Sequence, residues 1–438
     1  MRRMNEEVTA ARPSGADPRA VRAWALYDVG NSAFSTTVMA GFFPVFFKQY
    51  WCAGESATES TFRLGVTSSI ASALIALLAP VLGALGDQNS WRKSLLAWFA
   101  VLGALSTVGL AFVPKGDWLS SSLLFGLATI GFGCSIVFYD ALLVAVAPPG
   151  QSHRVSSLGY AMGYLGGGLL FAVNVAMTQK PALFGLADAG VAVRVSFATV
   201  GVWWLLFLIP LMRRVAEPAG GTGHGSLFAR LRPALSEVGR TIRTVRETRG
   251  VWLFLLAYWL YIDGVDTVIR MAVDYGLSIG LPSSSLIVAL LIVQFVGFPA
   301  AIACGKLASH IGEKRAVLAC LAVYVGVTMW GAQMTTSAEF YVLAVAIGLA
   351  QGGVQALSRS MWSQMVPPER AAELFGFYNM LGKMAAIIGP VLMGAVALAT
   401  GSTRISILSI TVLFFAGGIL LARVPMPKPA STRSEATS

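Results

Sequence analysis

Residues 63–93 read RLGVTSSIASALIALLAPVLGALGDQNSWRK. No charged residue lies between Arg63 and Asp87, and a short polar turn with the basic pair Arg92-Lys93 follows. A helix that rises 1.5 Å per residue needs about 20 apolar residues to cross about 30 Å of hydrocarbon. The stretch therefore predicts a membrane-spanning helix that ends in a short basic loop.

The same pattern recurs along the whole chain of 438 residues. Hydrophobic residues make up 56% and charged residues 12%, whereas a soluble domain carries roughly 25% charged residues. The composition and the spacing of the apolar runs predict an all-α membrane protein with twelve spans in two halves of six. The predicted spans are 22–50, 63–86, 94–113, 119–146, 155–178 and 195–214 in the first half, and 251–276, 284–308, 316–334, 338–363, 371–399 and 404–423 in the second.

The polar segments divide the chain into five parts. We expect an N-terminal tail (1–21), the first six-helix half (22–214), a linker (215–250), the second half (251–424) and a disordered tail (425–438). Within the linker, Leu227, Leu231, Leu235 and Val238 recur at spacings of four and three, with arginines between them. This spacing predicts a basic amphipathic helix that lies on an anionic membrane surface.

The two halves carry an internal repeat. Gly83, Leu85 and the basic pair at 92–93 match Gly305, Leu307 and the basic pair at 314–315 at a constant offset of 222. A proline pair at 148–149 also matches one at 367–368. Two equivalent halves around a central site are what a rocking transporter requires. Chance recurrence of glycine and basic pairs in short loops is the alternative explanation.

The basic residues predict the orientation of the chain. Of the 32 Lys and Arg, 23 fall on the side of both termini, six on the other side and three within spans. By the positive-inside rule both termini and the linker are cytoplasmic. We therefore expect a multi-pass protein of the bacterial inner membrane, and the net charge of +11 reflects topology and no nucleic-acid partner.

The signatures of soluble enzymes are missing from the sequence. It contains no phosphate-binding glycine loop and no Cys-x-x-Cys motif, so we expect neither a cofactor nor a metal. His153, His224 and His310 all lie in predicted loops, so no membrane-embedded histidine base is available. An intramembrane protease or acyltransferase is a weaker alternative, and we predict that the chain is not an enzyme.

Charges within predicted spans are the informative residues, because each costs a few kcal/mol in the bilayer centre. Counted inward at 1.5 Å per residue, Asp28 is about 9 Å deep, and Asp140 and Arg359 are about 12 Å deep. We expect these three side chains to form a charge cluster that closes the cytoplasmic side. Asp263 and Lys383 lie deeper, at about 17 Å.

The seventh span carries four charges on one helical face. Asp263, Asp266, Arg270 and Asp274 follow one another at spacings of three, four and four, so Arg270 can pair with the acid on either side. We expect Asp266, Arg270 and Asp274 to close the periplasmic end. For the deeper Asp263, both structural pairing and a role in coupling remain open.

The loop at 83–93 is a second candidate gate. Gly83, Arg92 and Lys93 recur in the repeat, and the place of Asp87 among them favours a latch between the halves over a solvated surface charge. Three glycines of the fifth span, at 159, 163 and 167, form a stripe of small residues that lets helices approach closely.

These motifs together resemble a known family. The 83–93 loop is similar to the signature loop of the major facilitator superfamily, which latches the two halves on the cytoplasmic side. The vacuole-effluxer branch, related to the fungal autophagy amino-acid exporter, is indicated by WALYDVGNSAF (24–34), SSLGY (156–160), GYLGG (163–167), YIDGV (261–265), QALSRS (355–360) and FGFY (375–378). Three positions depart from the pattern that the resemblance implies: Ile262 and Asp140 each replace an expected Asn, and Ser309 replaces the latch acid in the second half.

The resemblance and the buried charges together predict a secondary transporter of a small polar or zwitterionic solute, such as an amino acid, working as a proton-linked exporter. We expect substrate contacts from Asp28, Asn31, Asp140, Asp263, Gln355, Arg359, Asn379 and Lys383. Desolvation favours the protonated form of a carboxyl, so Asp263 and then Asp28 are the expected proton carriers. The expected partners are the solute, protons and the lipid bilayer, with the chain as a monomer. A lysolipid transporter and a non-transporting receptor are the alternatives.

Overall fold

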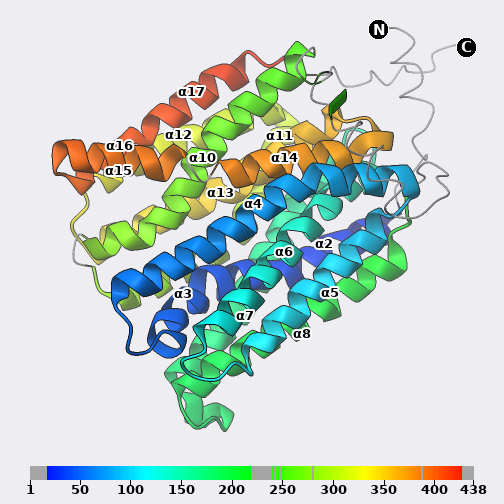
Figure 1. The fold of residues 1–438 in the computed structure, drawn as a ribbon. Coiled ribbons are helices and arrows are strands. Elements are labelled where there is room, and N and C mark those ends of the chain that lie inside the picture. The colour runs from blue at the N-terminus through cyan, green and yellow to red at the C-terminus, as the bar shows by residue number, and fades with distance from the viewer. Residues whose placement is uncertain are drawn as a thin grey trace, which may run out of the picture.

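We describe a computed structural model of the chain. It covers residues 17–218, 239–240, 243, 245, 248–278, 281–385 and 388–426. Helices, arranged in two groups, make up the ordered structure of these residues (Figure 1). Most of the predicted amphipathic helix of the linker and nearly all of the C-terminal tail lie outside the described residues.

The first half is built from six long segments. The first begins as α2 (Pro18–Ala33) and continues through η1 (Phe34–Phe42), α3 (Phe43–Phe46) and η2 (Phe47–Trp51). The others are α4 (Ala57–Asn89), α5 (Arg92–Leu110), α6 (Trp118–Val146), α7 (Ser152–Gln179) and α8 (Ala189–Arg214). The short η3 (Pro181–Phe184) lies between α7 and α8.

The second half repeats this order. It contains α10 (Arg249–Ser278), α11 (Ser283–Ile311), α12 (Glu313–Gly331) and α13 (Ser337–Met365), and then the one-turn η4 (Pro368–Arg370). The eleventh segment consists of α14 (Ala371–Met384) and α15 (Ile388–Thr400), and the twelfth of α16 (Thr403–Ser409) and α17 (Thr411–Ala422). The all-α prediction with twelve spans is confirmed.

Two of the twelve spans are irregular. Ten helical segments of the described part are long and apolar enough to cross a bilayer, and the remaining two spans are the first and the eleventh. The first contains π-helical turns on both sides of α3, where Pro44 lacks a backbone N–H. The eleventh, predicted as one run over 371–399, is instead divided between α14 and α15.

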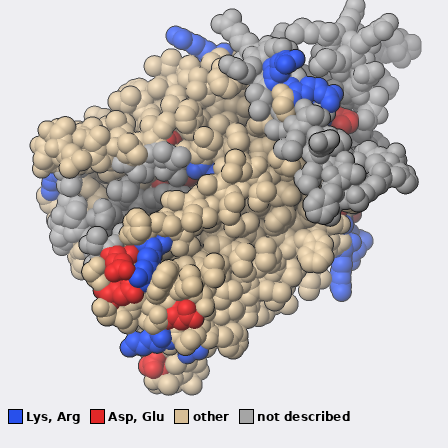
Figure 2. Space-filling view, viewed as in Figure 1, with Lys and Arg blue, Asp and Glu red and all other residues tan. Residues whose placement is uncertain are grey.

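The bundle has two ends and an apolar belt. We call the end where α2, α5, α7, α10, α12 and α14 begin the basic face, because Arg92, Lys93 and Lys314 lie there. In Figure 2 most of the visible charge gathers at the two ends, and mainly uncharged residues cover the belt between them. Large apolar side chains on this belt are exposed, including Leu77, Trp98 and Phe112, as a lipid-facing surface requires.

The two halves meet closely near the basic face. α4 packs along α14, and α7 packs along α11 and α13 (Figure 1). Glycines permit the approach: a Cβ on Gly83 would collide with the carbonyl of Ala372, and a Cβ on Gly376 would lie 2.5 Å from the carbonyl oxygen of Ala79. Among the described residues, α15 has no comparable packing against α4. The halves are therefore closely packed at the basic face.

Candidate functional site

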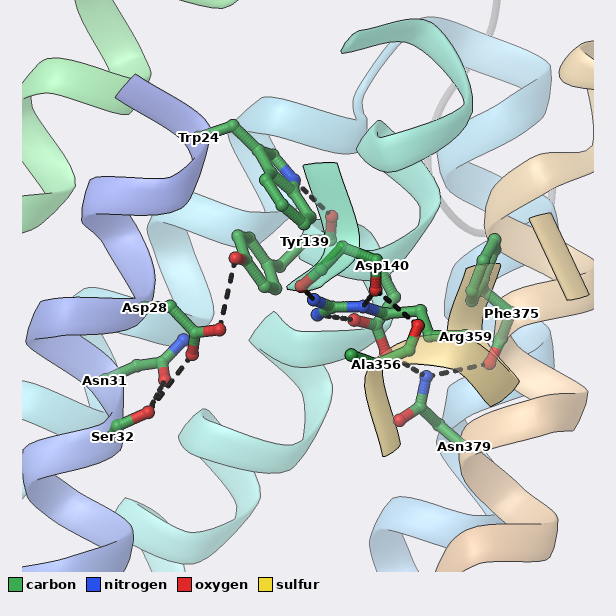
Figure 3. Close-up of polar contacts among 11 residues, drawn as sticks. Trp24, Asp28, Asn31, Ser32, Tyr139, Asp140, Ala356, Arg359, Phe375 and Asn379 are labelled. Atoms are coloured by element: carbon green, nitrogen blue, oxygen red, sulfur yellow. Dashed lines mark hydrogen bonds and ion pairs between the residues drawn. The ribbon is translucent and has the colours of Figure 1, made fainter. Parts of the chain in front are cut away.

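A buried ion pair joins the two halves below the basic face. Nη1 of Arg359, on α13, lies 2.9 Å from Oδ1 of Asp140, on α6. Arg359 also donates through Nε to Oγ of Ser156 at 2.9 Å and through Nη2 to the Ser156 carbonyl at 3.0 Å (Figure 3). Only 2% of Arg359 and 4% of Asp140 is exposed. A pair this buried is costly to break, because either charge left alone has no solvent to stabilise it.

Aromatic rings surround the guanidinium of Arg359. Its Cζ atom lies 4.3 Å from the ring centroid of Tyr160, 5.0 Å from that of Trp24 and 5.4 Å from that of Tyr139. Trp24 and Tyr139 stack at 4.4 Å, and the Trp24 indole donates to the Tyr139 carbonyl at 2.9 Å. Desolvated cation–π contacts contribute about 2 kcal/mol or more, so the rings help to hold the cation in place.

A second carboxylate, Asp28 of α2, lies beside this pair. Its Oδ2 accepts the hydroxyl of Tyr139 at 3.3 Å, and its Oδ1 accepts Oγ of Ser32 at 3.1 Å (Figure 3). The neighbouring Asn31 is 1% exposed, and its Nδ2 has no hydrogen-bond partner among the described residues. The cluster thus contains two acids and one arginine, so with both acids ionised it carries one net negative charge.

The glycines of α7 make room for this cluster. A Cβ on Gly159 would lie 2.9 Å from the Tyr139 hydroxyl and 3.1 Å from Nη2 of Arg359. A Cβ on Gly163 would lie 3.2 Å from the Asp28 carboxyl. The stripe that the sequence assigns to helix packing therefore also shapes the polar site.

The second half contributes further polar groups. Nδ2 of Asn379, on α14, donates to Oδ2 of Asp140 at 3.1 Å and to the Phe375 carbonyl at 3.0 Å. One turn further along α14, Nζ of the half-buried Lys383 lies 5.9 Å from the ring centroid of Phe132 on α6. The side chain of Gln355, on α13, is half-buried. Both halves thus supply groups to one site.

Asp263 has a different environment. It is fully buried, and its Oδ1 and Oδ2 accept the backbone N–H groups of Gly389 at 2.9 Å and Ile388 at 3.0 Å. Thr267 also donates to it at 3.3 Å. These N–H groups belong to the first turn of α15, which has no intrahelical acceptors for them. Asp263 therefore caps the second segment of the divided eleventh span.

The predicted latch residues lie where the halves meet. Arg92 Nε is 2.6 Å from Oδ1 of Asp87, and Asp87 accepts the backbone N–H of Ala372 at 3.0 Å and of Glu373 at 2.8 Å. Arg92 Nη2 also donates to the Pro368 carbonyl at 2.7 Å. Asp87 thus binds the N-terminal turn of α14 in the other half, where the helix dipole favours an anion.

Lys93 acts within the first half alone. Its Nζ donates to the Met212 carbonyl near the end of α8 at 3.1 Å, and its backbone N–H lies 3.0 Å from Oε2 of Glu217. Burial raises the pKa of the Glu217 carboxyl. Gly83, Asp87 and Arg92 therefore lie at the interface between the halves, and Lys93 positions the end of a neighbouring helix.

The structure describes only part of the gate that the sequence predicts at the opposite face. Asp266 is partly buried on α10, but the side chains of Arg270 and Asp274 lie outside the description. Their pairing stays a prediction.

Comparison with known proteins identifies the family. The family model described as "Vacuole effluxer Atg22 like" matches residues 50–149 and 145–434. The chain belongs to this Atg22-like family. It is 37% identical to the uncharacterized MFS-type transporter YxiO of Bacillus subtilis (strain 168), over 92% of this chain and 94% of that protein. It is 24% identical to autophagy-related protein 22 of Coccidioides immitis (strain RS), over 77% of this chain and 68% of that protein.

Solved structures support the fold of this Atg22-like chain. The human organic anion transporter MFSD10 superposes with a TM-score of 0.69 at 16% identity, covering 92% of this chain and all of that chain. The proton:xylose symporter XylE superposes with a TM-score of 0.66 at 15% identity, covering 94% and 95%. The chain is a multi-pass major facilitator transporter, as the MFS-type transporter YxiO is named.

Several groups in the site of this Atg22-like transporter are not among the residues predicted from sequence. Ser156, Ser32 and the rings of Trp24, Tyr139 and Tyr160 contact the charged cluster. Four of these five lie within the motifs that carry the family resemblance, and the fifth, Tyr139, directly precedes Asp140. The signal available in the sequence was that several of these residues lie on the same predicted spans as the buried charges.

Proposed function

We propose that this Atg22-like transporter exports a small polar or zwitterionic solute, such as an amino acid, by proton-linked alternating access. The observation that supports this most is the pairing of one arginine with two acids, Asp140 and Asp28, at the junction of the halves. Asp140 is matched by Arg359, whereas in the described part of the chain the Asp28 carboxylate accepts the hydroxyls of Tyr139 and Ser32. A buried carboxylate in this position is stabilised by a proton or by a cationic group of the solute.

The proposed substrate bridges the two halves. Its amine faces Asp28 and Asn31, and its carboxylate faces Lys383, whose partly exposed side chain crosses from α14 toward α6. Arg359 is enclosed by Asp140, Ser156 and aromatic rings, so it acts in closing the site and not as the first contact for the solute. Gln355 and Asn379 add neutral hydrogen bonds.

The proposed orientation places the basic face in the cytoplasm, with both termini on that side, in the bacterial inner membrane. The excess of basic residues on this face supports the assignment. The described structure is then closed to the cytoplasm, and rocking of the halves exposes the site to that side. The proposed transporter works as a monomer, because each half of one chain supplies groups to the site.

Thermal unfolding of the purified protein with a panel of amino acids tests the substrate class, since a ligand of the folded state raises the melting temperature. Amides and deaminated analogues of any amino acid that stabilises the protein are the matched controls. The bipartite site requires both ends of the zwitterion, so each analogue is expected to bind at least about tenfold more weakly, or 1.4 kcal/mol. Equal binding of either analogue rejects the bipartite site, and stabilisation by lysolipids alone favours an amphiphile.

A further inference from the structure

A histidine and a glutamate from different halves meet at the basic face. Nδ1 of His153, in the first turn of α7, lies 3.3 Å from Oε1 of Glu313, the first residue of α12. Their side chains are only 12% and 10% exposed. The contact is an ion pair only when the histidine is protonated. The strength of this contact between the halves therefore depends on pH.

Glu313 is held firmly on its own half. The same Oε1 accepts Oγ of Ser360 at 3.1 Å and Nε2 of Gln364 at 2.7 Å, both from α13. In contrast, Oε2 of Glu313 and Nε2 of His153 are buried without a hydrogen-bond partner in the described residues. The acid is thus positioned by the second half, and the histidine reaches it only when the basic face is closed.

The pair occupies the place equivalent to the Asp87 latch. The offset of 219 between the proline pairs relates His153 to Ala372, whose backbone N–H binds Asp87. The offset of 222 relates Asp87 to Ser309, but Ser309 bonds back to the Lys306 carbonyl at 2.6 Å within its own helix. Glu313, one turn further on, supplies the acid that Ser309 lacks.

The basic pair of each loop confirms the equivalence. In the first half, Lys93 donates to the Met212 carbonyl near the end of α8. In the second half, Lys314 donates to the carbonyls of Ala422, at 3.0 Å, and Val424, at 3.1 Å, at the end of α17. The two loops therefore share one architecture, in which a lysine holds the last helix of its half and an acid reaches the opposite half.

We propose that His153 and Glu313 form a proton-binding second latch, which holds the basic face closed when the cytoplasm is acidic. This inference rests on the proposed orientation and on alternating access. Protonation converts a contact with a neutral imidazole into an ion pair, which strengthens it. In the open state the two side chains separate, so the closed state binds the proton more tightly and a rise in proton concentration shifts the equilibrium toward it.

The other charges near the pair do not replace Glu313. The helices that pack against α7 include α11 and α13 of the second half and α2 and α8 of the first, and Glu313 reaches His153 from α12. The charges of α2 and α8 at the basic face are exposed, namely Arg19, Arg22, Arg213 and Arg214, and so is His310 of α11. On α11 and α12, Lys306 and Arg315 are exposed, and Lys314 is directed to helix carbonyls. On α13, Arg359 is bound to Asp140. Arg154, on α7 itself, is exposed. Glu313 is thus the acid that faces His153 among the described residues.

The test uses the full-length protein and needs no substrate. Ser157 is 2% exposed between α7 and α11, and its Oγ has no partner in the described residues. A Ser157→Cys variant therefore reports opening of the basic face through its rate of labelling by a maleimide. Labelling of an Ala187→Cys variant, at an exposed loop position, corrects for the pH dependence of the thiol reaction, and the parent protein corrects for its own cysteines.

The corrected labelling rate is expected to fall about fivefold from pH 8 to pH 6, within the usual range of coupling between two sites. In His153→Gln and Glu313→Gln backgrounds the rate is expected to be independent of pH. In a His153→Lys background, which carries a fixed charge, it is expected to stay low throughout. The proposal is overturned if the labelling rate of the Ser157→Cys variant with His153 and Glu313 intact does not change with pH. It is also overturned if the pH dependence persists in both Gln backgrounds. Because no transport is measured, this result is independent of whether the solute and proton coupling are assigned correctly.

Discussion

The carboxylate of Asp263 accepts the backbone N–H of Gly389 at 2.9 Å, and so joins α10 to the start of α15. Its other oxygen binds the N–H of Ile388. Asp28 has no such backbone donors and lies instead beside the ion pair that connects the halves. The sequence ranks Asp263 before Asp28 as the proton carrier, and this difference in contacts leads us to reverse the order.

Asp28→Asn is therefore expected to uncouple transport from protons. The amide cannot exchange a proton but still accepts hydrogen bonds from Ser32 and Tyr139, so the protein stays folded. In proteoliposomes, transport driven by a pH gradient is expected to be lost. Substrate exchange is expected to continue only at higher solute concentrations, because the amine of the solute loses its carboxylate partner. Asp263→Asn is the matched control: it weakens a helix cap by about 0.5–2 kcal/mol, which lowers the melting temperature and leaves gradient-driven transport in place. Full gradient-driven transport by the Asp28 variant would contradict the assignment.

Arg359→Ala is expected to abolish transport and to lower expression. It leaves Asp140 buried without its base, which costs about 3–5 kcal/mol. Arg359→Ala combined with Asp140→Ala removes both charges, so folded yield and melting temperature are expected to recover while transport stays absent. Size-exclusion chromatography and thermal unfolding measure both quantities. If the double variant is no better folded than the single one, the buried charge of Asp140 does not destabilise the protein when Arg359 is absent.

Gly83→Ala is expected to open the basic face. The added methyl group would collide with the carbonyl of Ala372 across the interface of the halves, and such overpacking costs about 1–3 kcal/mol. Labelling of Ser157→Cys is then expected to rise and the melting temperature to fall. Gly326→Ala on α12 is the control, since a Cβ there meets no atom within 4 Å. Equal behaviour of the two variants would rule out close packing at Gly83 as a determinant of closure.

Reporter fusions test the proposed orientation. With 23 basic residues on the side of the termini and six on the other, a fusion after Ser438 is expected to be active only as a cytoplasmic reporter. A fusion inserted between Glu55 and Glu59 is expected to be active only as a periplasmic one. The opposite pattern would invert the orientation and also the side from which His153 senses pH.

The sequence by itself determined that this protein lies in a lipid bilayer and how many times the chain crosses it. An apolar run of about 20 residues crosses a bilayer as a helix, because backbone N–H and C=O groups in hydrocarbon must form their hydrogen bonds within that helix. The same reasoning singled out Asp28, Asp140 and Arg359, since a charge in a span requires a partner. The register of a helix also predicted their similar depth, which is why three residues so far apart in the chain were expected to meet.

Only the tertiary structure decided which atoms these side chains contact. Asp263 looked like an unpaired charge in the sequence because its partners are backbone N–H groups, which every residue carries and no sequence pattern marks. Those donors lie in the first turn of α15, and hydropathy alone predicts one continuous helix over 371–399. Likewise, His153 and Glu313 are far apart in the chain and lie at ordinary loop positions. Their contact depends on how the two halves pack, which is a property of the whole interface and not of either segment.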